Sequence, residues 1–136
     1  MNSMSKVKII SCSGIGKVFG LMSRETALKI TNELKPNETE TVCLGHIVTG
    51  DADAKQKIEG YSCITIDGCP KHCAYKNTTL AGGIVKAQYK TIDQMKNHKG
   101  VDAGTATALT DDGWEIIDKL SEKICTKVDE ILKEDE

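Results

Sequence analysis

Two cysteines and a histidine lie close together in the middle of the chain, at Cys69, His72 and Cys73. They follow an apolar run with the composition of a β-strand, and Pro70 suits the first position of a helix. Unpaired N–H groups and the positive end of the dipole at a helix start stabilise thiolates. The pattern therefore predicts either metal-binding thiolates or a pair of redox-active thiols.

Two further cysteines are predicted to reach the same place. Cys12 closes the first predicted strand, and Cys43 lies late in the second. Ligands of open parallel sheets bind beyond the carboxyl ends of the strands. We therefore expect four thiols to meet at one sheet edge, those of Cys12, Cys43, Cys69 and Cys73. Four thiolates suit tetrahedral zinc, and they also suit iron or an iron–sulfur cluster.

The remaining two of the six cysteines have a different setting. Cys63 lies at the front of the third predicted strand, and Cys125 lies beside the apolar stripe of the last predicted helix. Free cysteines are commonly buried and behave as small hydrophobic residues. We expect both to be core residues rather than ligands.

Other polar residues near the thiols have several possible roles. Asp67 is predicted to orient the site by accepting amide hydrogen bonds from the following turn, to act as an acid or base, or to form a plain Asp-Gly turn. His72 is expected to point partly towards solvent. His46 replaces Cys43 as a ligand if the second strand ends early.

A zinc ion with four thiolates carries a net negative charge, which neighbouring groups must offset. The candidates are the amides of the loop 13–16, the first helical turn after Cys69, and the side chains of Lys17 and Lys71. Both lysines are equally well explained as solvated surface charges.

The predicted elements alternate between strand and helix. Strands are expected at 7–11, 40–47, 61–66 and 84–89, and helices at 23–35 after a Ser23 cap, at 51–59, from 69 to about 81, and from a cap at Asp112 onwards. One helical turn is expected at 92–96. This alternation predicts an α/β fold, a single three-layer domain with a mostly parallel sheet of about four strands flanked by helices. Residues 1–6 are expected to be a disordered N-terminal tail, and residues 7–136 the domain.

Composition limits the function classes. The formal charge is -2, aromatic residues make up 4% of the chain, and Arg24 is the only arginine. Nucleic-acid recognition relies on arginine and stacking aromatics, so no nucleic-acid partner is expected. No apolar run has the length of a membrane span, and Met1 to Lys8 has no apolar core of the signal-peptide type. A cytoplasmic location is expected, where cysteines rarely form disulfides.

Taken together, the motifs resemble the DGC-domain family, named after an Asp-Gly-Cys triplet. The matching segments are Cys12-Ser13-Gly14-Ile15-Gly16-Lys17-Val18-Phe19-Gly20, Thr41-Val42-Cys43-Leu44, Val48-Thr49-Gly50-Asp51 and Ile66-Asp67-Gly68-Cys69-Pro70-Lys71 with Cys73. The resemblance runs from about Val7 to Tyr89. It implies a zinc site held by Cys12, Cys43, Cys69 and Cys73, and it implies no particular reaction.

Three hypotheses follow for the function. The first is a zinc-binding protein, with the metal held at the carboxyl edge of the sheet and either fixed or handed to a protein partner. The second is a thiol-redox or sulfur-transfer enzyme in which Cys69 attacks and Cys73 resolves. The third is a structural module in which the cysteines only pack. Ligands drawn from three separate loops of a sheet favour a functional site over a purely structural one.

Overall fold

The structure is a computed structural model of the chain. It describes residues 6–11, 18–42, 44–68, 73–91, 104 and 108–134, and for residues 18–20 and 73 it describes the backbone only. The predicted tail residues 1–5 and the predicted helical turn 92–96 lie outside this part of the chain.

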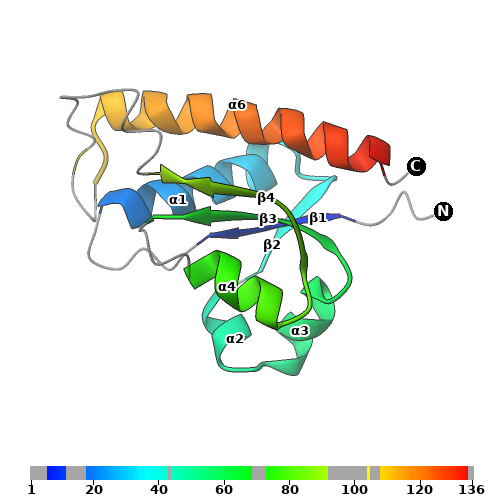
Figure 1. The fold of residues 1–136 in the computed structure, drawn as a ribbon. Helices are drawn as coiled ribbons and strands as arrows, with labels where there is room; N and C mark the ends of the chain where they lie inside the picture. Colours follow the sequence, from blue (N-terminus) through cyan, green and yellow to red (C-terminus); the bar gives the residue numbers. More distant parts are fainter. Residues whose placement is uncertain are drawn as a thin grey trace.

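The centre of the fold is one parallel sheet (Figure 1). Its four strands lie in the order β2-β1-β3-β4. They are β1 Val7–Ser11, β2 Thr39–Thr41, β3 Ser62–Asp67 and β4 Ile84–Lys90. Neighbouring strands all pair in parallel. The prediction of a parallel sheet is confirmed.

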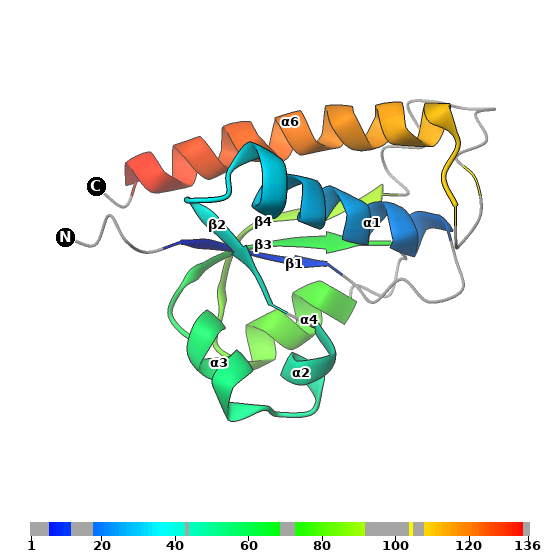
Figure 2. The same ribbon diagram turned by 180° about the vertical axis from the view of Figure 1, so that it is seen from behind.

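Helices cover both faces of this sheet. They are α1 Val18–Lys29, continued by the π-helix η2 Ile30–Leu34, then α2 Leu44–Val48, α3 Ala52–Ile58, α4 Cys73–Leu80 and α6 Asp111–Glu134. Helices α1 and α6 lie on one face, and α2, α3 and α4 lie on the other (Figures 1 and 2). This is the predicted three-layer α/β domain.

The last helix is positioned by its apolar stripe. Residues spaced three and four apart bury themselves against β1, β3 and α1, and the buried members include Ile116, Ile117, Leu120, Ile124, Val128 and Ile131. These are the residues expected from the sequence; Leu132, also expected, is partly buried against the same core. A second core lies on the opposite face, under α2, α3 and α4, and is built from Ile10, Val42, Leu44, Ile47, Ala54, Ile58, Cys63 and Ala74.

The prediction of a second strand over 40–47 is wrong in its second half. Strand β2 ends at Thr41, and Leu44–Val48 forms helix α2 instead. Leu44 and Ile47 are both buried in the second core. Their spacing of three residues suits one face of a helix, and a short apolar run does not separate the two periodicities by itself.

Two of the predicted helix caps are also wrong. Ser23 is buried inside α1, which starts at Val18. The last helix starts one residue before Asp112, and the Thr110 hydroxyl accepts the hydrogen bond from the Gly113 amide at 3.1 Å. The predicted short helix over 51–59 is confirmed as α3, and the Asp51 side chain caps it, a contact that was not predicted. In the part of the chain that is described, no helix is both long enough and apolar enough to cross a membrane.

Candidate metal centre

The carboxyl ends of three adjacent strands lie at the same edge of the sheet. Strand β1 is central, with β2 on one side and β3 on the other. Ile9 is paired with Thr41, the last residue of β2, and Ser11, the last residue of β1, is paired with Ile66. Strands β1 and β3 therefore end within one residue of the same level, and β2 ends two residues earlier than β1.

The predicted ligands follow these strand ends in the sequence. Cys12 comes directly after Ser11, Cys43 comes two residues after Thr41, and Cys69 comes two residues after the end of β3. Cys12, Cys43 and Cys69 lie outside the described residues. Cys73 is the first residue of α4, and only its backbone is described. The four-cysteine ligand set therefore stays a prediction.

The donor set and the strand spacing suit a zinc ion. Adjacent strands lie about 4.8 Å apart. Two thiolates on the same zinc ion lie roughly 4 Å apart, since each Zn–S bond is about 2.3 Å in a tetrahedral site. The distance between neighbouring strand ends is thus on the same scale as the distance between two thiolates of a four-thiolate site. Among the side chains that the structure describes, no group of three His, Cys, Asp or Glu residues is arranged to hold a metal ion.

Asp67 connects the end of β3 to the start of α4. Its side chain is fully buried, with 0% exposure. Oxygen Oδ1 accepts a hydrogen bond from the Ala74 amide at 2.8 Å, and Oδ2 accepts one from the Tyr75 amide at 3.3 Å. Of the three roles predicted for Asp67, the structure shows the first, that of an acceptor for amides in the following segment.

This contact occupies two amides in the first turn of α4. The amides of a helix start at Cys69 were predicted to stabilise thiolates at Cys69 and Cys73. The amides of Ala74 and Tyr75, which follow Cys73, donate to the Asp67 carboxylate instead. The amides between Cys69 and Cys73 lie outside the described residues, so their effect on the thiols stays a prediction.

The two cysteines predicted to be structural are described completely. Cys63 is fully buried and belongs to the second core. Burial raises the pKa of the Cys63 thiol to about 11. Cys125 is partly buried against the first core, and burial also raises the pKa of its thiol. Neither is in a disulfide, so both are the free packing residues that were predicted.

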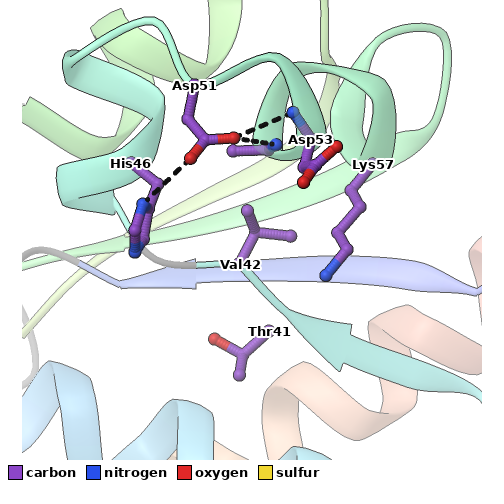
Figure 3. A pocket seen from close by; sticks show the side chains of 7 residues that line it. Thr41, Val42, His46, Asp51, Asp53 and Lys57 are labelled. Atoms are coloured by element: carbon purple, nitrogen blue, oxygen red, sulfur yellow. Dashed lines mark hydrogen bonds and ion pairs between the residues drawn. The ribbon is translucent and has the colours of Figure 1, made fainter.

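A small open pocket lies beside the end of β2 (Figure 3). It has a volume of about 240 Å³ and is lined by Thr41, Val42, His46, Asp51, Asp53, Ala54 and Lys57. Nδ1 of His46 lies 3.3 Å from Oδ2 of Asp51. His46 and Lys57 lie on either side of Val42, the residue before Cys43.

Sequence reasoning missed this pocket because it depends on β2 ending at Thr41 and on α2 following directly. The early end of β2 meets the condition under which His46 was considered as a replacement ligand for Cys43. The described contact of His46 is with Asp51. The other residues considered near the thiols, His72, Lys17 and Lys71, lie outside the described residues, as does the loop 13–16.

Comparison with known proteins gives one match. The family model of the DGC domain matches residues 8–124. No curated protein and no solved structure matches the chain.

Proposed function

The chain belongs to the DGC-domain family, and from this membership and the geometry of the sheet edge we propose that it is a zinc-binding protein. The proposed ligands are the thiolates of Cys12, Cys43, Cys69 and Cys73. The zinc ion would join the loops after β1, β2 and β3 and the start of α4. The proposed setting is the reducing cytoplasm, where cysteines stay out of disulfides and the four proposed ligands remain free thiols.

The observation that carries the proposal is the convergence of three strand ends. Cysteines follow β2, β1 and β3 in the sequence, and these are adjacent strands whose carboxyl ends share one edge. Had any of the three strands been antiparallel, its cysteine would have been carried to the opposite edge, more than ten ångströms away. Soft thiolate ligands at one place select zinc or iron over magnesium and calcium.

A held zinc ion supplies positive charge and four covalent links among the loops. The chain's own residues bind it, and Asp67 keeps the start of α4 against the sheet. Because the sheet has a buried core on each face, we expect the fold to form without these links. This supports a role in which the metal is bound and released, rather than one in which it only holds the fold together.

The second candidate function is the thiol-redox or sulfur-transfer enzyme. It requires Cys69 to be an activated thiolate, and the surroundings of Cys69 lie outside the described residues. A redox pair needs only two cysteines, whereas cysteines follow the ends of three adjacent strands, and this supports the metal-binding function over the redox one.

The test is metal analysis of anaerobically purified protein together with a count of protected thiols. We would use the variant Cys63→Ala/Cys125→Ala, because it leaves only the four proposed ligands among the six cysteines. The expected result is about one zinc per chain and protection of all four thiols from alkylation until a chelator is added.

Two other results would count against the proposal. Protein without metal, in which Cys69 and Cys73 rapidly form a disulfide in air, would favour the redox enzyme. Iron with sulfide in the purified protein would replace zinc by an iron–sulfur cluster at the same ligands.

A further inference from the structure

We propose that Asp67 is a positioning residue for the metal site: it sets where α4 starts, and thereby where Cys73 stands relative to the sheet. This inference rests on the proposed zinc-binding function, because it concerns how the site is held and not whether it exists. The Asp67 carboxylate contacts backbone amides only, as far as the described residues show.

The carboxylate is attached to a rigid part of the molecule. Asp67 is the last residue of β3, which is paired on both sides, with β1 and with β4. Asp67 itself is paired with Lys90, and its neighbour Ile66 with Ser11. With 0% exposure, the side chain is held by surrounding protein rather than by water.

The first turn of α4 is bonded to this fixed carboxylate. The two hydrogen bonds bridge sequence separations of seven and eight residues. Ala74, which donates the shorter one, is fully buried in the core formed with Ile10 and Val42. The start of α4 is therefore held in two ways, by the packing of Ala74 in the second core and by the hydrogen bonds from the Ala74 and Tyr75 amides to Asp67.

The consequence concerns the proposed thiol ligands. Asp67 and Ala74 flank the segment that carries both Cys69 and Cys73, and both are placed by the contacts just described. Replacement of Asp67 leaves the amides of Ala74 and Tyr75 without their acceptor. Cys73 lies in the same first turn of α4, so it moves with any shift of this turn. A tetrahedral site tolerates such a shift poorly, and groups that orient metal ligands typically change affinity by 10- to 100-fold when replaced.

Asp51 provides a matched control in the same chain. Its carboxylate also caps a helix, with hydrogen bonds from Asp53 and Ala54 of 2.8 and 3.3 Å. These are the same two distances that Asp67 makes, but Asp51 caps locally, over two and three residues, at the start of α3. Loss of the Asp51 cap therefore weakens a helix without moving α4.

The experiment compares Asp67→Asn with Asp51→Ala. In Asp67→Asn, the amide nitrogen cannot accept the second hydrogen bond and instead faces a backbone N–H. The probe is cobalt(II), whose visible absorption reports coordination geometry and thiolate ligation, and zinc affinity is measured by competition with a chelator. Circular dichroism of the metal-free variants shows whether each is folded.

We expect Asp67→Asn to shift the cobalt spectrum and to lower zinc affinity by about 10- to 100-fold. Asp51→Ala should lower the melting temperature while leaving both metal readouts at wild-type values. If Asp67→Asn does not fold, Asp67→Glu keeps both acceptor oxygens but displaces them by one methylene, and the same shift in the cobalt spectrum is expected from it.

The positioning role of Asp67 and the zinc-binding function would be overturned by different results. Wild-type cobalt bands and wild-type zinc affinity in a folded Asp67 variant would overturn the positioning role alone. A wild-type protein that takes up no cobalt and no zinc would overturn the proposed function, and the positioning role with it.

Discussion

Burial makes the Cys63 thiol harder to ionise than an ordinary cysteine thiol. Its thiol lies fully inside the second core, and the loss of solvation raises its pKa to about 11. A thiol with this pKa is almost entirely protonated at neutral pH, and only thiolates bind metal or act as nucleophiles. Cys63 is therefore unsuited to either proposed chemistry, although it lies on the same strand as Asp67.

This contrast predicts the outcome of a serine scan. Cys12→Ser, Cys43→Ser, Cys69→Ser and Cys73→Ser should each greatly weaken zinc binding, whereas Cys63→Ser and Cys125→Ser should leave it nearly unchanged. The buried hydroxyl in Cys63→Ser is expected to cost about 1–3 kcal/mol of unfolding free energy. Chelator competition and urea unfolding measure the two effects separately. Loss of zinc in Cys63→Ser with retention in Cys43→Ser would show that the ligand set is wrong.

At the scale of elements, a partly buried ion pair joins the two strands β1 and β2. Nζ of Lys8 lies 2.9 Å from Oε2 of Glu40 and 4.6 Å from the centre of the Tyr61 ring. Lys8 is 5% exposed, so its charge depends on these partners. The hydrogen bond from Lys8 is the main reason that the pKa of Glu40 lies below its ordinary value.

Replacement of this carboxylate is predicted to have a pH-dependent effect. Glu40→Gln should lower the unfolding free energy at neutral pH by about 1–2 kcal/mol, the lower part of the range for charged hydrogen bonds because Glu40 is partly exposed. A lowered pKa means that the stabilisation is present above the ordinary carboxyl pKa of 4.5 and is lost as pH falls through the lowered value. The difference between variant and wild type should therefore shrink in acid.

Urea unfolding across a pH series measures this difference. Lys57→Gln is the control, since that lysine is exposed and lies 3.9 Å from the other oxygen of Glu40. It should change stability by only a few tenths of a kcal/mol. A difference between Glu40→Gln and wild type that stays constant with pH would contradict the assignment of the stabilisation to the ionised pair.

The connection between α4 and β4 leaves no room for a side chain at Gly83. A Cβ atom on Gly83 would lie 2.7 Å from Cγ2 of Thr78 and 3.0 Å from Sγ of Cys63. Both neighbours belong to buried residues, so neither is free to move aside. Gly83 thus allows β4 to start directly against the end of α4.

We predict that Gly83→Ala lowers the unfolding free energy by about 1–3 kcal/mol, because the added methyl group overpacks this contact. Addition of Thr78→Ser, which removes Cγ2, should restore part of the loss, while the contact with Cys63 remains. Thermal unfolding of the single and double variants measures both effects. A Gly83→Ala protein as stable as wild type would show that the junction relaxes at no cost.

At the scale of the whole molecule, each face of the sheet has a core of its own. One joins the sheet to α1 and α6, and the other joins it to α2, α3 and α4. On the first face, two ion pairs also join α6 to its neighbours, Lys29 of α1 with Asp118 and Lys35, which follows η2, with Asp129 at 2.8 Å. The described contacts therefore hold all three layers together without a metal ion.

The metal-free protein is accordingly predicted to keep its secondary structure. Circular dichroism before and after chelation should show nearly the same helical signal, while the four ligand thiols become reactive towards alkylation. A cooperative loss of most of the helical signal on chelation would mean that the metal holds the fold, contrary to the proposed exchangeable role. Recovery of the original helical signal and thiol protection when zinc alone is added back is the control for irreversible damage.

Local sequence patterns determined much of this fold. The stripe from Ile116 to Ile131, the apolar run of β3 and the short helix that begins after Asp51 were all predicted correctly. Each depends on residues a few positions apart, and their spacing alone indicates which face of the helix or strand is buried. The alternation of strands and helices was sufficient for the parallel sheet, because parallel strands need crossover connections.

Only the tertiary structure decided the features that depend on distant groups. Leu44 and Ile47 form a helix because a core on that face of the sheet receives them both. Asp67 reaches amides seven and eight residues ahead, and no local pattern states which of its three predicted roles it adopts. The strand order β2-β1-β3-β4, which brings three cysteine-bearing loops to adjacent positions, likewise depends on packing across the whole sheet and not on any one segment.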